Sequence, residues 1–152
     1  MITSIGQCSC GQTKVILTLP KSLDKYNPRA CDCDFCRSRN ISYLSHPEGK
    51  LEIESGELLE VQQQGSNQAS FLTCSSCKSV LAACLQLENQ LIGALNSTLL
   101  SNFTSLQEPI KVSPKLLEAK EKIERWQSVW LDIKVNGKNC IKSISKTGDT
   151  NG

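Results

Sequence analysis

Short runs in which apolar and polar residues alternate predict a chain built mainly of β-strands. The stretch TKVILTL at 13–19 alternates and is rich in β-branched residues, which is typical of a half-buried strand. Residues 50–65 contain two strand-like runs on either side of Gly56, and Leu51 and Ile53 fall on one face. Three further runs are ASFLT at 69–73, SVLAACLQL at 79–87 and LIGAL at 91–95. These punctuated runs are too short for a mainly helical protein.

Residues 113 to 130 change to a helical period. Ser113 and Pro114 form a helix start, because proline suits the first helical position. An apolar stripe then recurs at spacings of three and four residues: Leu116, Ala119, Ile123, Trp126 and Trp130. Two favourable charge pairs four residues apart accompany it: Glu118–Lys122 and Glu121–Arg125. The pattern predicts an amphipathic helix over about 115–130, with the tryptophans as core anchors rather than a ligand platform.

The length of 152 residues suits a single domain, which we place at 1–136. Residues 137–152 are polar and unpatterned, which favours a flexible tail. The N-terminal MITSIGQCSC lacks the basic and apolar segments of a secretory signal, and no apolar run reaches the roughly 18 residues of a membrane span. We therefore expect a cytoplasmic protein without a membrane partner.

The charge of the chain gives no sign of a nucleic-acid partner. The formal net charge is +2, with acids and bases interspersed. Seven thiolates bound to two Zn²⁺ would add seven negative and four positive charges, which takes the net charge to about −1. A nucleic-acid-binding zinc ribbon would also need basic and aromatic residues interleaved near its cysteines, and CSSCKS and CDFCRS offer one basic residue each.

The nine cysteines are the main chemical signal. Their odd number and the missing secretory signal favour metal binding over disulfides. Seven of them form three groups, and the other two stand apart. The groups are Cys8-x-Cys10, Cys31-x-Cys33-x-x-Cys36 and Cys74-x-x-Cys77, and the separate residues are Cys84 and Cys140.

The first and last groups predict one closed zinc site of four thiolates: Cys8, Cys10, Cys74 and Cys77. The turn after such a pair often needs a positive φ, which glycine adopts readily. Gly11 follows the first pair, whereas Lys78 follows the second at a cost on the order of 1 kcal/mol. The alternative is that these cysteines are buried or redox-active thiols.

The middle group, Cys31, Cys33 and Cys36, predicts a three-thiolate zinc site with an exchangeable fourth ligand, as in catalytic zinc sites. Three alternatives remain open. Asp32 or Asp34 could supply the fourth ligand, as could Cys84 or Cys140, or the CDFC segment could be a redox pair. The single histidine, His46, lies in a turn-like SHPEG segment and is expected in solvent; its isolation excludes Ser-His-Asp and Cys-His catalysis.

The order of the seven cysteines resembles the glutathione-dependent formaldehyde-activating enzyme family, also called the centromere-protein-V domain family. The matching stretches are GQCSCGQTKV, CDCDFCRS and FLTCSSCKSVL, with Gly56 and LIGALN in agreement. The resemblance covers about residues 5 to 96, with weaker agreement to Trp126. The family usually has histidine where this chain has Asp32, and glycine where it has Ile41 and Lys78.

The resemblance implies a mainly β fold of small antiparallel sheets joined by zinc, related to methionine sulfoxide reductase B. It also implies two Zn²⁺ per chain: a structural zinc on the first and last cysteine groups, and a catalytic-type zinc on the middle group. The family's activity is described as carbon–sulfur lyase chemistry, the reversible addition of glutathione to formaldehyde that gives S-hydroxymethylglutathione.

The expected function is therefore a zinc-dependent carbon–sulfur lyase that acts on a small thiol such as glutathione and an aldehyde. Thiolate-ligated zinc favours a soft sulfur ligand, which fits a thiol substrate. Because glutathione carries two carboxylates, basic residues are expected nearby, and Arg37 is the first candidate, whereas Arg29 and Arg39 are expected at the surface. Asp32 or Asp34 could move a proton. The alternative function is a non-catalytic, zinc-stabilised protein-interaction domain.

Overall fold

The computed structural model describes residues 1–31, 41–63, 70–112 and 119–144 of the chain. The predicted mainly β class is confirmed. The strands are β1 (Ile2–Gln7), β2 (Thr13–Leu19), β3 (Arg29–Cys31), β4 (Tyr43–Leu44), β5 (Lys50–Ser55), β6 (Glu60–Gln63), β7 (Ser70–Thr73), β8 (Val80–Gln86), β9 (Leu91–Asn96), β10 (Ile110–Val112) and β11 (Leu131–Val135). The helices are α2 (Ala119–Val129) and α3 (Ile141–Ile144), with single 3-10 turns η1 (Leu23–Lys25), η2 (Ser97–Leu99) and η3 (Phe103–Ser105).

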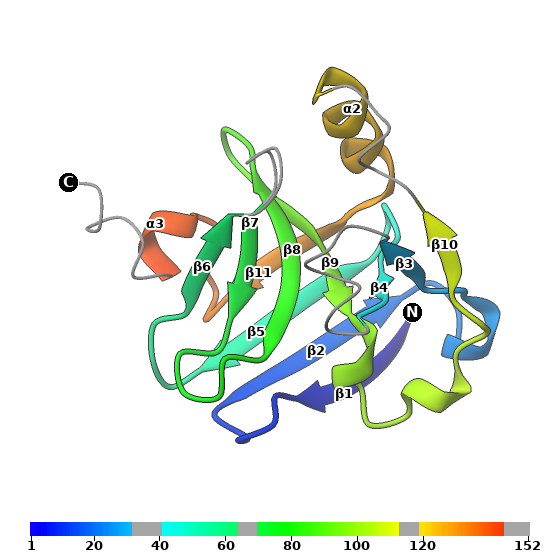
Figure 1. The fold of residues 1–152 in the computed structure, drawn as a ribbon, viewed down its shortest axis with the longest axis horizontal. Helices are drawn as coiled ribbons and strands as arrows, with labels where there is room; N and C mark the ends of the chain where they lie inside the picture. The colour runs from blue at the N-terminus through cyan, green and yellow to red at the C-terminus, as the bar shows by residue number, and fades with distance from the viewer. Residues whose placement is uncertain (32–40, 64–69, 113–118, 145–152) are drawn as a thin grey trace.

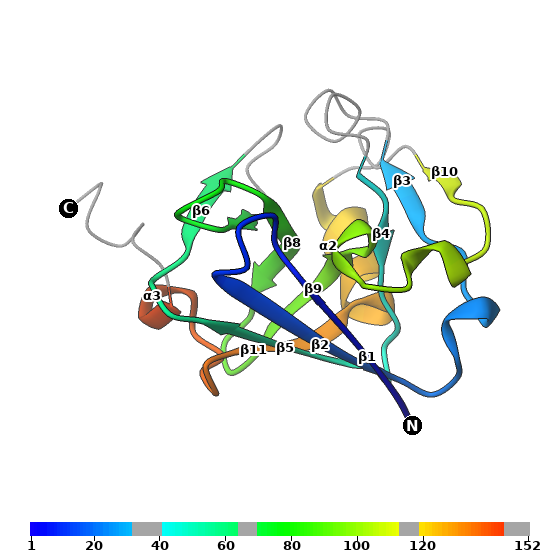
Figure 2. The same cartoon turned by 90° about the horizontal axis from the view of Figure 1, so that it is seen from below.

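The described strands form one continuous hydrogen-bonded network in the order β1-β2-β5-β11-β9-β4-β3-β10, and β8, β7 and β6 branch from β9. Most pairings are antiparallel, but β11 runs parallel to β5 and β10 runs parallel to β3. The described strands thus belong to one hydrogen-bonded sheet, where the resemblance implies small antiparallel sheets joined by zinc. Figures 1 and 2 show β6, β7 and β8 on the side opposite β3, β4 and β10.

The alternation predicted for β2 and β5 is what builds the core. Val15 and Leu17 of β2 are fully buried, and they face Ile53 and Leu51 of β5 in register. The alternate positions of both strands are half-buried or exposed, as expected for an antiparallel pair with one solvated face. Burial of each such side chain stabilises the fold by about 1.5–3 kcal/mol.

The strand β11 was not predicted from the sequence, although its LDIKV alternates. Leu131, Ile133 and Val135 are buried in the same core cluster as the β2 and β5 residues. β11 lies between β5 and β9, in the middle of the network. Five residues directly after a helix are too short a pattern to separate from a helix end, and the central position depends on pairing with distant strands.

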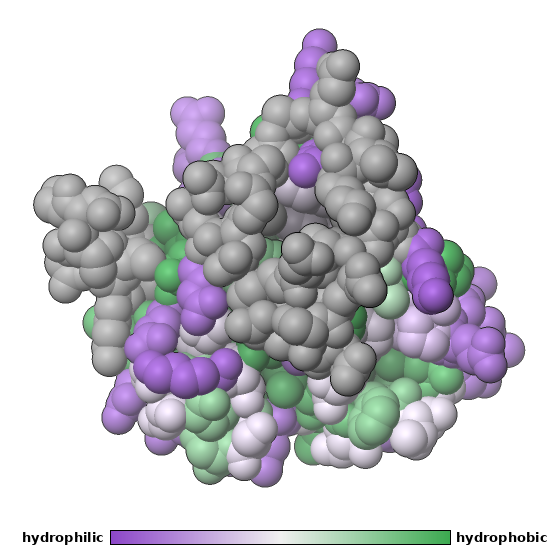
Figure 3. Space-filling model, in the orientation of Figure 1, coloured by the Kyte–Doolittle hydropathy of each residue, from purple (hydrophilic) through white to green (hydrophobic). Residues whose placement is uncertain are grey.

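The helix α2 begins within the described residues at Ala119 and ends at Val129, inside the predicted span; positions 115–118 lie outside the described residues. Its tryptophans differ from the expected core anchors. Trp126 and Trp130 are half-buried and stack on each other with ring centres 4.6 Å apart. Trp130 packs against a second apolar cluster, whose buried members are Ile41, Tyr43, Phe71, Val80, Ala83 and Ala94. Figure 1 shows α2 at the edge of the strand layers, and Figure 3 shows hydrophilic residues over that edge.

Residues 137–144, which the sequence analysis assigns to the tail, contain the short helix α3. α3 lies beside β6, and the Leu59 backbone N–H donates to the Ile144 carbonyl at 3.0 Å. The Ile141 N–H donates to Gln86 Oε1 at 2.7 Å, and Ile144 is only 3% exposed. This mostly polar segment contains two isoleucines, and Ile144 is buried in the main core cluster.

Within the described ranges, no helix is long and apolar enough to cross a membrane.

Candidate metal centre

Two turns from distant parts of the chain carry the cysteines of the candidate metal centre. Cys8 and Cys10 lie in the turn between β1 and β2, and Cys74 and Cys77 lie in the turn between β7 and β8. The two turns close in similar ways. The Cys8 N–H donates to the Thr13 carbonyl and the Cys74 N–H donates to the Ser79 carbonyl, both at 3.0 Å. Each turn therefore presents its pair of sulfurs from a strand-anchored loop.

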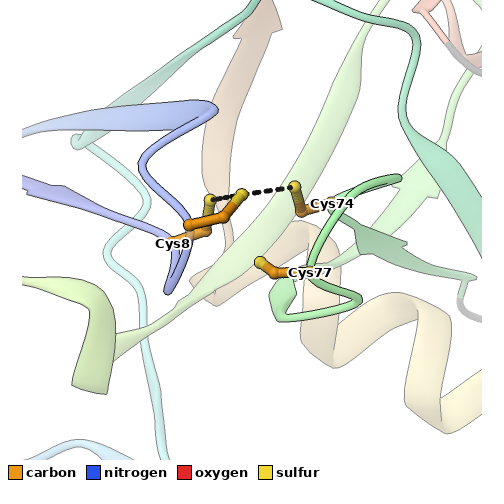
Figure 4. Close-up of side chains that lie close together, drawn as sticks. Cys8, Cys74 and Cys77 are labelled. Carbon is orange, nitrogen blue, oxygen red and sulfur yellow. Dashed lines mark hydrogen bonds between the residues drawn. The ribbon is translucent and has the colours of Figure 1, made fainter.

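The four sulfur atoms lie within 4.8 Å of one another. Cys8 Sγ is 3.6 Å from Cys10 Sγ, and Cys10 Sγ is 3.7 Å from Cys74 Sγ. Tetrahedral coordination at a Zn–S distance of about 2.3 Å places sulfurs about 3.8 Å apart, so the observed spacing fits four thiolates around one ion. Figure 4 shows the side chains converging from the two turns. The structure thus brings together the four cysteines that the sequence groups, in an arrangement that could bind a metal ion.

The residue after each cysteine pair has a left-handed backbone, as the sequence analysis anticipates. Gly11 has a φ of 79° and Lys78 has a φ of 63°. The Lys78 N–H donates to the Cys74 carbonyl at 2.9 Å, which closes the turn. Glycine adopts this conformation without cost, whereas an L-residue such as lysine pays on the order of 1 kcal/mol. The Lys78 side chain forms an ion pair with Glu60 Oε2 at 2.6 Å.

Hydrogen bonds to the sulfurs come from residues that the sequence analysis did not single out. The Thr13 N–H donates to Cys8 Sγ at 3.3 Å, and the Ser79 hydroxyl lies 3.0 Å from Cys77 Sγ. The Ser79 hydroxyl also lies 3.1 Å from the Ser9 hydroxyl in the other turn. The sequence feature that could have indicated the role of Ser79 is its hydroxyl side chain two residues after Cys77. Such outer contacts orient metal ligands and support their charge.

The electrostatics of the four thiols favour a bound cation. Burial raises the pKa of Cys77, but hydrogen bonds from Ser79 and Cys10 outweigh it and lower the pKa from 9.0 to about 5. A backbone hydrogen bond from Gln12 lowers the pKa of Cys10, yet desolvation and the three neighbouring thiols raise it to about 11. Hydrogen bonding thus favours the thiolate at Cys77, whereas burial and the neighbouring thiols disfavour it at Cys10. A dication removes this conflict, because it stabilises every thiolate that it binds.

The middle cysteine group lies almost wholly outside the described residues. Cys31 ends strand β3, and the structure describes neither Cys33 and Cys36 nor Asp32, Asp34, Arg37 and Arg39. The chain returns to the described fold at Ile41, which is 6% exposed in the second apolar cluster. The open three-cysteine site and the role of Arg37 accordingly stay predictions.

The two separate cysteines and the histidine take no part in the four-sulfur cluster. Cys84 is fully buried in the main core, and burial raises its pKa to about 12. Cys140 is exposed. His46 is half-buried in a turn, where its Nδ1 accepts from the Glu48 N–H at 3.0 Å and its ring contacts Tyr26 edge-on. The expectation that His46 lies in solvent is thus met only in part.

A shallow groove of about 490 Å³ lies on the opposite, solvated face of β2, β5 and β11. Its charged lining alternates in sign across the strands, with Lys14 paired in register to Glu54 and Lys134 to Glu52. Cross-strand pairs of this kind stabilise a solvated sheet face. The groove contains no cysteine and is separate from the candidate metal centre.

Comparisons with known proteins place the chain in a family. The model of the family described as glutathione-dependent formaldehyde-activating enzyme matches residues 3–115, which include all seven grouped cysteines. A crystal structure of a Rhodobacter sphaeroides protein has a similar fold, with a TM-score of 0.54 and 23% identity over 71% of this chain and 99% of that one. No curated protein matches. The family match spans most of the chain and both turns of the metal centre, so the chain belongs to the glutathione-dependent formaldehyde-activating enzyme family.

Proposed function

We propose that the protein is a zinc-dependent carbon–sulfur lyase that handles thiol–aldehyde adducts such as S-hydroxymethylglutathione. The proposal rests on one observation: in a chain of this family, four of the grouped cysteines form one cluster and three do not belong to it. Four of the seven grouped cysteines share one cluster: Cys8, Cys10, Cys74 and Cys77. The three that remain, Cys31, Cys33 and Cys36, are assigned in this proposal to a second zinc with an open fourth position.

The four-cysteine cluster suits a structural role. Four thiolates complete the tetrahedral shell of a zinc ion and leave no position for a substrate. The cluster joins the β1–β2 turn to the β7–β8 turn, which belong to separate parts of the strand network. The chemistry is therefore assigned to the middle group, at the end of β3.

The proposed reaction forms or breaks one carbon–sulfur bond. In the forward direction the sulfur of the thiol adds to the carbonyl carbon of the aldehyde, and the carbonyl oxygen takes up a proton. In the reverse direction the hydroxyl loses its proton, the C–S bond breaks, and the thiolate leaves. A thiolate-ligated zinc lowers the pKa of a bound thiol and holds it as a thiolate. Asp32 or Asp34 would move the proton, and Arg37 would contact a substrate carboxylate.

We also propose that the protein works in a reducing compartment such as the cytoplasm. The cysteines of the candidate metal centre and Cys84 form no disulfide among the described residues, and a thiolate metal centre needs its sulfurs reduced.

Metal analysis tests the two-site assignment. The purified wild type should contain about two zinc per chain, and Cys36→Ala should contain about one. Cys140→Ala is the matched control, because Cys140 is exposed and outside both proposed sites, and it should keep two. A content of one zinc that Cys36→Ala leaves unchanged would refute the open site.

An activity assay tests the chemistry. Glutathione and formaldehyde equilibrate with their adduct without a catalyst, so exchange between free and adduct glutathione is measured by NMR with and without enzyme. We expect exchange to accelerate with the wild type and not with Cys36→Ala. If no thiol and no aldehyde shows acceleration by a protein with two zinc ions, the lyase proposal is wrong, and the interaction-domain alternative takes its place.

A further inference from the structure

One cysteine of the candidate metal centre is open to solvent. Cys10 is exposed, whereas Cys77 is half-buried and the other two members, Cys8 and Cys74, are buried. The susceptibility of a cysteine to oxidation follows its exposure and its thiolate character. A metal-bound sulfur is a thiolate, so the exposed member of the cluster meets both conditions. Cys10 is therefore the sulfur that a small oxidant in the solvent reaches first.

Two other sulfurs lie close to that of Cys10. Cys8 Sγ is 3.6 Å away in the same turn, and Cys74 Sγ is 3.7 Å away in the other turn. The turn that carries Cys8 is closed by the Gly11 N–H, which donates to the Cys8 carbonyl at 3.1 Å, and the Thr13 N–H donates to Cys8 Sγ at 3.3 Å. A disulfide inside this short closed turn would depart from ordinary disulfide geometry, and such departures store strain and make the bond easier to reduce.

The pair formed by Cys10 and Cys74 is free of this restriction. The two residues lie 64 positions apart on separate turns, so a small shift of one turn against the other brings their sulfurs together. Figure 4 marks the interaction that joins the Cys74 sulfur to the opposite turn. The contact between the Ser9 and Ser79 hydroxyls, at 3.1 Å, keeps the turns side by side independently of the sulfurs. Cys74 is thus the better placed partner for an oxidised Cys10.

We propose that Cys10 and Cys74 form a redox switch of the four-cysteine cluster, in which hydrogen peroxide converts the two thiolates to a disulfide and the metal ion is released. The Cys10 sulfur attacks one oxygen of the peroxide, the O–O bond breaks, hydroxide leaves, and Cys10 becomes a sulfenic acid. The Cys74 thiolate then attacks the Cys10 sulfur, a second hydroxide leaves, and the S–S bond forms. Two thiolates and one peroxide thus give one disulfide and two hydroxide ions.

Oxidation changes what joins the two turns. Cys8 and Cys77 remain as thiols, and two sulfurs cannot complete the tetrahedral shell of zinc. The disulfide still links the β1–β2 turn to the β7–β8 turn, and a bridge across so long a loop constrains the unfolded chain. A small thiol reverses the step by exchange: two thiols are oxidised to their disulfide while Cys10 and Cys74 are reduced. The switch needs zinc at the cluster but does not depend on the lyase activity proposed above.

Peptide mapping of the zinc-loaded, full-length protein tests which disulfide forms. The protein is treated with hydrogen peroxide, its remaining thiols are alkylated, and it is digested with trypsin. Cleavage after lysine and arginine places the two cysteine pairs of the cluster on separate peptides, 1–14 and 51–78. We expect the two peptides to become joined, with fragmentation locating the bridge at Cys10 and Cys74. A bridge between Cys8 and Cys10 within one peptide overturns the proposal, as does oxidation of Cys10 without any bridge.

Zinc release, measured with a chromogenic chelator, tests the dependence on Cys10. Cys10→His keeps a zinc ligand, because three cysteines and one histidine form a familiar structural site, but it cannot form the disulfide. Peroxide should release about one zinc per chain fewer from Cys10→His than from the wild type. Cys77→His is the matched control, because it makes the same replacement but keeps both sulfurs of the switch, and it should release zinc as the wild type does. Cys140→Ala, which lacks an exposed cysteine outside the cluster, should do the same.

Equal release from Cys10→His and the wild type overturns the switch, as does full retention of zinc by the peroxide-treated wild type. Failure of glutathione and added zinc to restore the metal content would also overturn it, because the oxidation would then be damage. Metal analysis before oxidation shows whether Cys10→His binds zinc; if it does not, the peptide map of the wild type decides alone. A wild type that forms the bridge but accelerates no adduct exchange supports the switch and refutes the lyase, and the opposite pair of results does the reverse.

Discussion

The Ser79 hydroxyl lies 3.1 Å from the Ser9 hydroxyl and 3.0 Å from the sulfur of Cys77. This one side chain therefore joins the two cysteine turns, which are 70 residues apart in the sequence, and contacts a candidate metal ligand. It supports the thiolate form of Cys77 and fixes the spacing of the turns at the same time.

Ser79→Ala should weaken metal binding at the four-cysteine cluster by about tenfold, the lower end of the range for removal of an outer contact to a metal ligand. The measurement is competition for zinc with a chromogenic chelator. Ser79→Thr keeps the hydroxyl and should stay close to the wild type. Ser75→Ala is the matched control, because the Ser75 hydroxyl donates to Glu57 rather than to a sulfur. Equal affinity in Ser79→Ala and Ser75→Ala would show that the contact is incidental.

Lys78→Gly should be more stable than Lys78→Ala by about 1 kcal/mol, because the backbone at this position is left-handed. Both variants lose the ion pair with Glu60, so their difference isolates the backbone. Urea unfolding of the zinc-saturated proteins gives the comparison. At Lys14, in the extended strand β2, the order should reverse, since glycine weakens a strand relative to alanine. If the glycine variant were more stable than the alanine variant at both positions, backbone strain at Lys78 would not explain the difference.

Gly93→Ala should destabilise the fold by about 3 kcal/mol or more. A Cβ at this position would overlap the carbonyl oxygen of Ala83 on the neighbouring strand and press against Ile133 of β11. Gly56→Ala is the control, because its Cβ would meet only the flexible end of Gln12, and it should cost less than about 1 kcal/mol. Thermal unfolding distinguishes the two. A Gly93→Ala variant as stable as Gly56→Ala would mean that β8 and β9 are less closely packed than described.

The buried thiol of Cys84 should make the protein less stable as the pH rises above 9. Its pKa is raised by burial from 9.0 to about 12, so between these values the unfolded chain loses this proton while the folded chain keeps it. Stability present below pH 9 is then lost at roughly 1.4 kcal/mol per pH unit. Cys84→Ala should lose stability less steeply over pH 9–11, whereas Cys140→Ala, at an exposed position, should follow the wild type. If the wild type, Cys84→Ala and Cys140→Ala all lose stability with the same dependence on pH, the Cys84 thiol is not the cause.

The sequence predicts those strands in which apolar and polar residues alternate along a short run. The run 13–19 has the same bounds as β2, and Leu51 and Ile53 do share the buried face of β5. β11 was missed because its place between β5 and β9 depends on partners some 40 to 80 residues away. The burial of Ile144 could not be predicted, because the segment around it is polar and its partners in the core cluster are distant in the sequence.

The four-cysteine cluster could be predicted for a different reason. The spacing of each cysteine pair and the glycine after the first are local, and the chemistry of four soft ligands leaves few partners to choose from. The contact of Ser79 with Ser9 had no such signal. It arises where two turns that are 70 residues apart in the sequence meet in the fold.

The central place of β11 also determines the order of events when the chain leaves the ribosome. The ladders β1–β2–β5 and β9–β4–β3–β10 are connected, among the described strands, through β11. Until residue 135 has been synthesised, these two groups have no continuous ladder, and each exposes an unpaired strand edge. The cysteine turns, both complete by residue 77, are available earlier. Zinc captured at that point would hold the β1–β2 turn beside the β7–β8 turn before β9 and β11 are synthesised.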